Sequence, residues 1–560
     1  MLLIWKAHWK GLSLAVAMAL GSASISVAQT DILDSGGFLF PEQASYNVHH
    51  YDIDLFVDPT DRSLHGSVIT SAEIVQPLSH FVLDLDTTFT VHRILYFDDH
   101  HNPILMDYER RHGQIWARFP ITRQPGDQVK IEVEYEGHPR MAPNPPWGGG
   151  FTWAETPSGD PWIGVSCQLN GADLWWPVKD HPSDRADSIS LKVTVANPLV
   201  VAGPGELREL TDLDNGYSTY SWFVSNPINN YALSMNIAPY DIIEDDYRSV
   251  SGNTFPIYFW VLPENLEKAK RLMVQIKEHM AFYEEYLGPY PFQNDKYGIV
   301  ETPFLGMEHQ TLIAYGAGFI NDIVFSTDSG FDDLHHHELG HEWWGNKVTA
   351  YDWKDFWIHE GFCTYMQALY AEHLHGAKQY QKFMASIRKR IGNIQPVAPR
   401  ESKSTKEMNE SQDAYMKGAW FLHTLRYLMG DDHFFTALRQ MADPDRLRGK
   451  IVGDSNSHFA TTDDFLYIAN NIDGNDLTWL FEVYLRQEKL PFLKYSKEGN
   501  QLNLHWTVPG DLHFPMPVEI MIDGSMQTIQ VPSGGASVNV KQGASLKIDP
   551  DHWILKELDY

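Results

Sequence analysis

Cysteine and basic residues are both scarce in this sequence. Only two of its 560 residues are cysteines, Cys167 and Cys363, so no disulfide framework is implied. Lysine and arginine together number 43 against 73 aspartates and glutamates, which gives a formal net charge of −30 at pH 7. Because nucleic-acid binding requires a basic face, this charge argues against a nucleic-acid partner. We interpret the acidity as a source of solubility rather than as an attraction for cationic peptides.

Long apolar runs are also missing, apart from one near the N-terminus. The run from Leu12 to Leu20 follows Lys6 and Lys10 and precedes Ser26-Val27-Ala28, an order that is typical of a secretory signal peptide. We therefore predict that residues 1–28 are removed and that the mature protein is exported, either periplasmic or secreted. An uncleaved membrane anchor is the alternative. No other stretch is long and apolar enough to span a membrane, so no stable membrane span is expected after cleavage.

Strand patterns fill the chain after the signal segment. Apolar and acidic residues alternate over residues 51–57 and again over residues 131–135. Such alternation is typical of strands with one buried face, and it predicts an N-terminal antiparallel β domain over residues 29–242. The Pro/Gly-rich stretch from Pro143 to Gly150 is too irregular for a strand and is predicted as a loop.

Helical and then strand patterns occupy the rest of the chain. Apolar positions three and four residues apart predict a mostly helical domain over residues 243–490. The helical patterns that we recognise are Leu266–Tyr283, the region around His337, Thr364–Tyr370, Gly418–Leu428 and Leu477–Leu485. Alternation returns past Pro491 and predicts a small C-terminal β-sandwich over residues 491–560. The expected fold class is therefore a multidomain α+β protein.

The segment His337-Glu338-Leu339-Gly340-His341 has the form HExxH. On a helix, residues four apart lie on one face, so His337 and His341 direct two imidazoles to one point, with Glu338 beside them. Two histidines bind zinc in this arrangement and the glutamate activates a water molecule. A bare HExxH also occurs by chance in long chains, so the interpretation depends on further residues.

A third zinc ligand is required for a catalytic site. We expect Gly345-Asn346 to end the first helix and a second helix to return Glu360 to the metal. The predicted cofactor is thus one zinc ion per chain, bound by His337, His341 and Glu360.

These residues and their neighbours resemble the M1 family of zinc aminopeptidases, the gluzincin group that includes aminopeptidase N and leukotriene A4 hydrolase. The spacing of eighteen residues between His341 and Glu360 matches the family signature. Further segments similar to the family are Trp344-Gly345-Asn346, Glu360-Gly361-Phe362, Gly306-Met307-Glu308, Tyr415-Met416-Lys417-Gly418-Ala419, Ser166-Cys167-Gln168 and Asn226-Pro227-Ile228-Asn229-Asn230-Tyr231. The resemblance implies a thermolysin-like catalytic domain that acts on peptides with a free N-terminus.

The resemblance also implies roles for individual residues. Glu338 would be the general base, and Tyr415 would donate a hydrogen bond to the oxyanion. Glu308 would bind the α-ammonium group of the substrate, on a substrate-binding segment with Gly306 and Met307. Gln168 would contact the first residue of the substrate, or instead satisfy backbone groups. The alternatives for Glu308 and Tyr415 are an ordinary strand carboxylate and a core tyrosine.

The sequence departs from the family pattern at several positions. Leu305 stands where the substrate motif begins with glycine, and His309 stands where it has asparagine. His359 replaces an asparagine before the third ligand, either as a partner of the zinc site or as a plain helix residue. Many relatives carry a helical C-terminal domain over the cleft, whereas this sequence ends after the predicted sandwich. We expect either a more open cleft or a second copy of the chain, in a homodimer, to cover it.

Three functions from different classes fit these patterns. The first, which we prefer, is an aminopeptidase, because Met307-Glu308 matches the motif for a free N-terminus. The second is another zinc enzyme of the same fold, such as an endopeptidase or an epoxide hydrolase. The third is an inactive binding protein, but such a protein has no need of a complete catalytic set.

Overall fold

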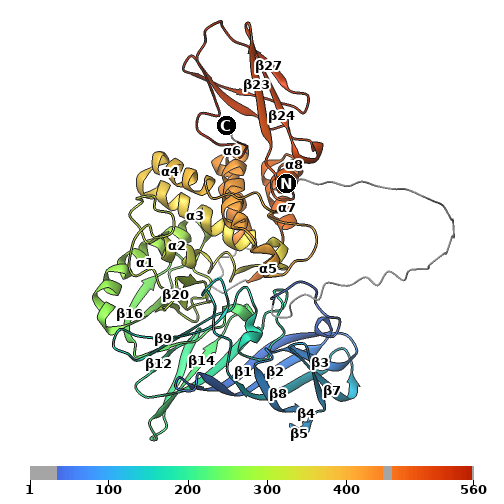
Figure 1. The fold of residues 1–560 in the computed structure, drawn as a ribbon, viewed down its shortest axis with the longest axis vertical. Helices are drawn as coiled ribbons and strands as arrows, with labels where there is room; N and C mark the ends of the chain where they lie inside the picture. Colours follow the sequence, from blue (N-terminus) through green and yellow to red (C-terminus); the bar gives the residue numbers. More distant parts are fainter. Residues whose placement is uncertain (1–33, 445–456, 558–560) are drawn as a thin grey trace, which may run out of the picture. The chain divides into compact units, whose positions relative to one another are not determined.

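The computed structural model describes residues 34–444 and 457–557, so the predicted signal peptide lies outside the described residues. Strands dominate up to Val261, helices follow from Leu266 to Tyr484, and strands return from Phe492 (Figure 1). The β-rich N-terminal region and the helical region after it are therefore confirmed. No helix among the described residues is long and apolar enough to cross a membrane.

The N-terminal β region contains three sheets. Its strands are β1 (Tyr46–Asp58), β2 (Ser63–Ile74), β3 (Leu78–Asp84), β4 (Phe89–Phe97), β5 (Pro103–Leu105), β6 (Tyr108–Arg111), β7 (Gln114–Arg123), β8 (Gln128–Gly137), β9 (Gly150–Glu155), β10 (Pro161–Ser166), β11 (Ser188–Ala196), β12 (Val200–Ala202), β13 (Glu206–Asp212), β14 (Tyr217–Val224) and β15 (Asn236–Ala238). The largest sheet runs β13-β14-β11-β1-β2-β8-β4-β5, and the others run β12-β15-β10-β9 and β3-β7-β6. In β1, Ile53 and Leu55 are buried whereas Asp54 is exposed, so the sequence alternation reports the two faces of the strand.

One strand pair differs from the predicted antiparallel arrangement. β1 and β11 are parallel, with His50 opposite Ser188 and Phe56 opposite Thr194. The chain leaves the large sheet after β8, forms β9 and β10 of the second sheet, and re-enters the large sheet at β11. Parallel neighbours require such a long connection. The prediction was wrong here because the alternation of apolar residues does not reveal strand direction.

A fourth sheet, of mixed strand direction, introduces the helical region. Its strands are β16 (Asp241–Arg248), β17 (Thr254–Val261), β18 (Tyr297–Glu301), β19 (Gly306–Met307) and β20 (Ile313–Tyr315). They are ordered β16-β17-β18-β20-β19, so β19 is an edge strand. This short edge strand carries two of the predicted substrate-binding residues and ends one residue before Glu308.

The helical region is organised around α3, which packs against α2, α4 and α6. Its helices are α1 (Leu266–Leu287), α2 (Asp333–Gly340), α3 (Trp357–His375), α4 (Ala377–Arg388), α5 (Thr405–Met408), α6 (Asp413–Ala442), α7 (Thr462–Asp473) and α8 (Thr478–Tyr484). Two short strands, β21 (Val348–Ala350) and β22 (His458–Ala460), pair in parallel. Four tryptophans are fully buried in or just before α3 and after α2, namely Trp343, Trp344, Trp353 and Trp357. A large aromatic side chain buries about 150–250 Å², so these four tryptophans provide much of the core around the predicted zinc ligands.

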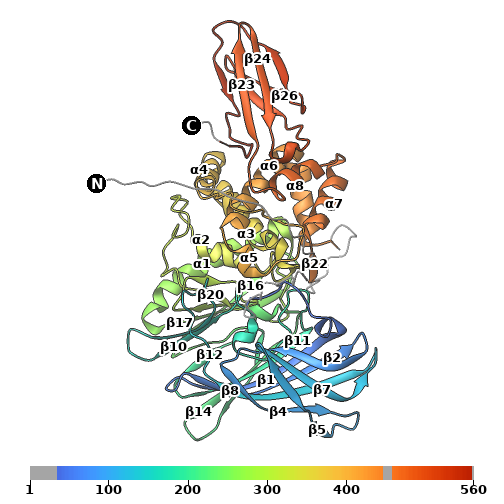
Figure 2. The ribbon, with the colours of Figure 1, turned by 45° about the vertical axis from the view of Figure 1, so that its right-hand side comes forward.

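The C-terminal strands form two further sheets, drawn in red in Figure 2. Their strands are β23 (Phe492–Glu498), β24 (Gln501–Thr507), β25 (Val518–Ile522), β26 (Ser525–Ile529), β27 (Ala536–Asn539) and β28 (Leu546–Ile548), ordered β23-β24-β27 and β26-β25-β28. Trp506 of β24 packs edge-on against Phe514, which also contacts Trp479 of α8. After the sheets the chain returns to the helices, where Tyr484 donates a hydrogen bond to the carbonyl of Leu555.

Candidate active site

Helix α2 carries the HExxH segment. Its N-cap residue Asp332 accepts a hydrogen bond from the backbone N–H of His335, which satisfies one of the free donors of the first turn. The helix ends at Gly340, five residues before the Gly345 at which we expected it to stop. The backbone there tightens, because the N–H of Trp343 bonds to the carbonyl of Gly340, three residues back. His341 keeps helical torsions, so it still lies one turn from His337.

The end of α2 lies in a crowded place that requires glycine. A Cβ atom at Gly340 would lie 2.3 Å from the hydroxyl of Tyr283 and 3.1 Å from Sγ of Cys363. Gly340 therefore allows α2 to approach α1 and α3 closely. The x positions of the HExxH segment thus serve the packing of the helix that presents the ligands.

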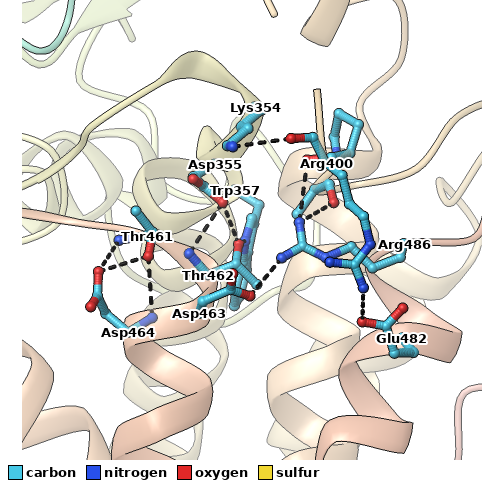
Figure 3. A network of polar contacts seen from close by, with 12 residues as sticks. Lys354, Asp355, Trp357, Arg400, Thr461, Thr462, Asp463, Asp464, Glu482 and Arg486 are labelled. Atoms are coloured by element: carbon cyan, nitrogen blue, oxygen red, sulfur yellow. Dashed lines mark hydrogen bonds and ion pairs between the residues drawn. The ribbon is translucent and has the colours of Figure 1, made fainter. Parts of the chain in front are cut away.

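Helix α3 brings Glu360 to the same point. Just before the helix, Asp355 accepts hydrogen bonds from the backbone N–H and hydroxyl of Thr462, and Trp357 Nε1 donates to that hydroxyl at 2.8 Å (Figure 3). Arg486 extends the network from Asp463 to the carbonyl of Ala398. These contacts fix the start of α3 against α7, so Glu360, in its first turn, has a defined position.

Helices α3 and α6 cross at a pair of glycines. A Cβ on Gly361 would lie 3.0 Å from Cα of Gly418, and a Cβ on Gly418 would lie 3.1 Å from Cα of Gly361. The two backbones therefore approach as closely as glycine permits. This contact places Tyr415, near the start of α6, beside Glu360 and explains glycine in both family-like segments.

The three predicted zinc ligands converge. His337 Nε2 lies 3.1 Å from His341 Nε2 and 3.3 Å from Glu360 Oε2, and His341 Nε2 lies 3.4 Å from the same oxygen. Donor atoms about 2.0–2.1 Å from one tetrahedral ion lie about 3.3 Å apart. Two imidazole nitrogens and one carboxylate oxygen at this spacing fit a zinc ion with one open position. The cluster also meets the geometric requirement for a metal site among the described residues.

The second nitrogen of each imidazole has its own partner. His337 Nδ1 lies 3.1 Å from Oε1 of Gln367, and His341 Nδ1 lies 2.9 Å from the carbonyl oxygen of Trp344. Gln367 Nε2 donates to the carbonyl of Asp333, which leaves Oε1 as the acceptor facing His337. Both imidazoles thus carry their proton on Nδ1 and present the Nε2 lone pair to the metal. Sequence reasoning missed Gln367, although its place two turns after Glu360 on the same helix face was a usable signal.

The negative charge of Glu360 is stabilised by the two neighbouring histidines, His337 and His341. Burial raises the pKa of Glu360, but His341 and His337 outweigh this effect and hold the pKa below its usual range. Glu360 therefore stays ionised, as a metal ligand must.

Glu338 lies against the edge strand β19. A Cβ on Gly306 would lie 2.6 Å from Oε1 of Glu338, so the absence of a side chain at Gly306 leaves room for the carboxylate. Burial raises the pKa of Glu338 well above its usual range; His341 lowers it, and the Glu308 and Glu360 carboxylates raise it further. A carboxyl group with a raised pKa is suited to accept and release a proton near neutral pH.

Glu308 is buried, with 3% of its surface exposed, and is held by two donors. Gln168 Nε2 and the hydroxyl of Tyr231, at 3.0 Å, both donate to its Oε1. Within the described chain, no other residue donates a hydrogen bond to Oε2. Gln168 thus orients Glu308, a contact that neither sequence interpretation anticipated. Tyr231 belongs to a segment that resembled the family, but its role as a partner of Glu308 was missed.

Tyr415 is partly buried and lies over the zinc ligands. Its ring is nearly parallel to that of His337, with 6.2 Å between the ring centroids. Burial raises the pKa of Tyr415 well above its usual value, and the charge of Glu360 raises it further, so the phenol stays protonated as a donor. The side chain lines the pocket beside the ligands.

The departures from the family pattern have different outcomes. Leu305 lines the pocket, whereas His309 is fully buried outside the pocket lining. His359 Nε2 accepts a hydrogen bond from the backbone N–H of Ala350 at 2.9 Å and so anchors β21. His359 therefore forms no hydrogen bond with a predicted zinc ligand among the described residues, and it is more than a plain helix residue.

The predicted site residues line one pocket of about 480 Å³. Its lining includes His337, Glu338, His341, Glu360, Glu308, Met307, Gly306, Gln168 and Tyr415. This volume is within the range of small-ligand sites, about 300–1,000 Å³. The structure thus gathers in one cavity the three predicted metal ligands, a candidate base, a candidate oxyanion donor and the buried carboxylate of Glu308.

Residues 272–454 match the peptidase family M1 domain, in agreement with the resemblance seen in the sequence. Leukotriene A-4 hydrolase of Xenopus laevis is 24% identical over 366 residues, which cover 63% of this chain and 55% of that protein. Aminopeptidase N of Escherichia coli K12 is 24% identical over 357 residues, or 59% of this chain and 39% of that protein. The chain thus spans about half the length of these curated relatives or less.

A solved structure extends the similarity to the fold. The M1 zinc metallopeptidase of Deinococcus radiodurans, in a mutant form bound to a Tyr-Ser-Ala substrate, has a TM-score of 0.66 at 23% identity. The match covers 82% of this chain and 98% of that one. A second structure of the M1 zinc metallopeptidase from Deinococcus radiodurans gives the same TM-score, 0.66.

Proposed function

We propose that this chain, whose residues 272–454 match the peptidase family M1 domain, is a zinc-dependent aminopeptidase that removes N-terminal residues from peptides. The observation that carries the proposal is the free Oε2 atom of Glu308 in the same pocket as the metal cluster. A buried carboxylate with one unpartnered oxygen is a site for a cation, and the free α-ammonium group of a peptide is such a cation.

The residues around the cluster divide the chemical work. Zinc, when held by His337, His341 and Glu360, supplies Lewis acidity that polarises a carbonyl and makes water nucleophilic near neutral pH. Glu338 accepts a proton from the attacking water and returns it to the leaving amine. The Tyr415 hydroxyl donates a hydrogen bond to the oxygen on which negative charge develops.

Glu308 then sets which bond is cleaved. An ammonium group paired with Oε2 of Glu308 places the first peptide bond, rather than a later one, over the metal cluster. Gln168 and Tyr231 hold the other oxygen of the carboxylate, so its position does not depend on the substrate. An N-acetylated peptide has no charge for Glu308 and would leave this carboxylate buried and unpaired, which is costly.

The test compares one peptide in free and N-acetylated form, with and without a zinc chelator. We expect the free form to be cleaved far better, the chelator to abolish cleavage, and Glu308→Ala to remove most of the preference. Glu338→Gln should retain zinc while turnover falls by roughly two to four orders of magnitude. Equal cleavage of both forms, or cleavage in mid-chain, would contradict the proposal and favour an endopeptidase of the same fold.

Three further sequence predictions extend this proposal. The two C-terminal sheets each bury residues on one face, such as Leu504 and Ile520, which supports a small β-sandwich. Export rests on residues 1–28, and N-terminal sequencing of the mature protein should begin at Gln29; an N-terminus at Met1 on membranes would favour an anchor. A homodimer in which a second copy of the chain covers the cleft would be detected as a doubled molecular mass in light scattering.

A further inference from the structure

A single cationic side chain lines the pocket. Among the lining residues, Glu308, Glu338, Glu360 and Glu410 are acidic, whereas Arg390 alone is a lysine or arginine. The chain as a whole carries an excess of acid, with a net charge of −30. An arginine in such surroundings usually pairs with a carboxylate, yet within the described chain no carboxylate forms an ion pair with Arg390.

Arg390 is held in place by neutral groups. It lies in the turn after α4, where its backbone N–H bonds to the carbonyl of Ile387. Its Nη2 donates to the carbonyl of Val324 at 2.8 Å, and its guanidinium carbon lies 4.8 Å from the ring centroid of Phe325. Only one of the five N–H groups is thereby used, so a fork of donors remains for an anion.

The wall that carries Arg390 is well supported. The backbone N–H groups of Val324 and Phe325 both donate to the carboxylate of Asp333, at 3.0 and 2.9 Å. The ring of Phe325 packs on Phe383 of α4, with 4.9 Å between the centroids. The guanidinium is therefore presented by a segment fixed to both α2 and α4.

Contacts connect the pocket lining from Gly306 to Arg390. A Cβ on Gly306 would lie 2.6 Å from Glu338 and 2.9 Å from Leu334, so these three residues adjoin one another. Leu334 follows Asp333, which holds the Val324 segment, and that segment holds Arg390. Leu334, which adjoins Gly306, is thus connected to the segment that holds Arg390 through its neighbour Asp333.

A peptide that lies along β19 with its N-terminus at Glu308 runs past Gly306 toward Leu334. Because β19 is an edge strand, its free edge can accept such an extended chain. The residues that follow the scissile bond would then approach Arg390. The pocket lining therefore offers the carboxylate of Glu308 and the guanidinium of Arg390, which together match a zwitterionic peptide with an ammonium group at one end and a carboxylate at the other.

We propose that Arg390 forms a carboxylate-binding subsite on the leaving-group side, and that the preferred substrates are short peptides whose free C-terminal carboxylate reaches it. This inference rests on the proposed aminopeptidase function and names its substrate class. An acidic side chain in the leaving portion offers the same chemistry, and it is distinguished below from the C-terminus. Arg390 binds substrate in this proposal and takes no part in bond cleavage.

The experiment uses peptides of two to five residues with one common N-terminal residue, each as the free acid and as the C-terminal amide. The quantity measured is the ratio of kcat/KM for acid and amide in wild type, Arg390→Ala, Arg390→Lys and the control Lys389→Ala. Lys389 is the neighbouring cation, exposed like Arg390, and it does not line the pocket. An aminoacyl arylamide, which lacks a carboxylate, reports the basic aminopeptidase activity separately.

We expect the wild type to prefer the acid about fivefold to tenfold at one short length, an effect suited to a partly exposed charged contact. The preference should disappear in the longest peptide. Arg390→Ala should bring the ratio near one, Arg390→Lys should retain part of it, and Lys389→Ala should leave it unchanged. All variants should hydrolyse the arylamide at similar rates. A C-terminal amide with glutamate after the scissile bond should be cleaved as well as the free acid only if Arg390 binds an acidic side chain instead of the C-terminal carboxylate.

Several results would overturn the subsite. A wild-type ratio near one at every length, or a preference that survives in Arg390→Ala, excludes it. If Lys389→Ala lowered the acid-to-amide ratio as much as Arg390→Ala, the preference would come from the general positive charge of this surface and not from Arg390. Because the ratio is internal to each variant, a partly unfolded preparation does not mimic the expected result. Absence of arylamide hydrolysis in wild type would instead contradict the proposed function.

Discussion

Asn346 Nδ2 donates a hydrogen bond to the main-chain carbonyl of Glu308, with 3.0 Å between the two atoms. Asn346 lies in the turn after the zinc-binding helix, and Glu308 follows the edge strand of the mixed sheet. A second link is parallel to it, because Glu342 Oε1 accepts the backbone N–H of Thr311 at 2.8 Å. These bonds fix the distance between the metal cluster and the carboxylate proposed to bind the N-terminus.

Removal of the Asn346 side chain should therefore loosen substrate positioning. Asn346→Ala leaves a buried carbonyl without its donor, which costs about 1–3 kcal/mol, and frees the Glu308 segment to shift. We expect kcat/KM for free peptides to fall about tenfold or more while that for acetylated peptides changes little. Steady-state kinetics on both forms measures this, with the exposed Asn475→Ala as control. A uniform loss for both forms would indicate a folding defect instead.

Gln367 should tune zinc affinity without being a ligand. Gln367→Ala removes the acceptor that orients His337, so zinc affinity should fall by about 10- to 100-fold. Competition with a chromogenic chelator measures the affinity. Gln379→Ala, on α4, is the matched control, since its amide bonds to Thr327 and Ser329 rather than to a ligand. Unchanged affinity in Gln367→Ala would show that His337 needs no such partner.

A methyl group at Gly306 should displace the general base. The added Cβ would lie 2.6 Å from Oε1 of Glu338, so the carboxylate must move. A shift of about 1 Å can cost about a hundredfold in rate, and we expect a loss of that order in kcat for Gly306→Ala with zinc content unchanged. Gly534→Ala serves as control, because nothing lies within 4 Å of the Cβ position there. Normal kcat in Gly306→Ala would mean that Glu338 relaxes at no cost.

Tyr415→Phe should act on the chemical step. The lost hydroxyl is a donor whose hydrogen bond strengthens as negative charge develops, so kcat should fall by about a hundredfold or more while KM changes little. Tyr467→Phe, at a tyrosine with 69% of its surface exposed, controls for the loss of a hydroxyl. A normal kcat in Tyr415→Phe would return this residue to a packing role.

Asp84, far from the pocket in sequence, should make stability depend on pH. Burial raises its pKa to about 6 from 3.8, although Gln114 and the backbone N–H of Asp180 donate hydrogen bonds to it. The folded state thus binds the proton more tightly than the unfolded state. The contribution of Asp84 to the free energy of unfolding therefore increases by about 3 kcal/mol as the pH falls from about 6 to about 4. The same contribution is lost as the pH rises again.

The measurement compares thermal midpoints of the wild type and Asp84→Asn between pH 4 and pH 7. The wild-type midpoint should rise relative to the variant as pH falls through 6. Because other carboxyl groups are common to both proteins, the difference isolates Asp84. If the difference between the two midpoints did not change with pH, burial would not raise the pKa of Asp84 in the folded state.

Local patterns in the sequence were sufficient for the zinc ligands. His337 and His341 share a helix face because of their spacing alone, and Glu360 was predicted from the return of a second helix, in agreement with the family signature. The alternation in β1 and the apolar stripe of α1 likewise follow from the periodicities of strand and helix. The helices α4, α5 and α7 were missed.

Other features were decided only when remote segments packed together. The helix α2 ends at Gly340, where the N–H of Trp343 bonds to the carbonyl three residues back, and β11 is parallel to β1 because the chain first crosses another sheet. Gln367, Tyr231 and Asn346 became partners of site residues that lie 30 to 77 positions away in the sequence. A buried polar atom must find a partner, but the sequence does not say which one, since that depends on the packing of distant elements. The sequence alone therefore determined which residues could bind zinc, and the tertiary structure decided how the ligands, Glu308 and Arg390 are oriented around the pocket.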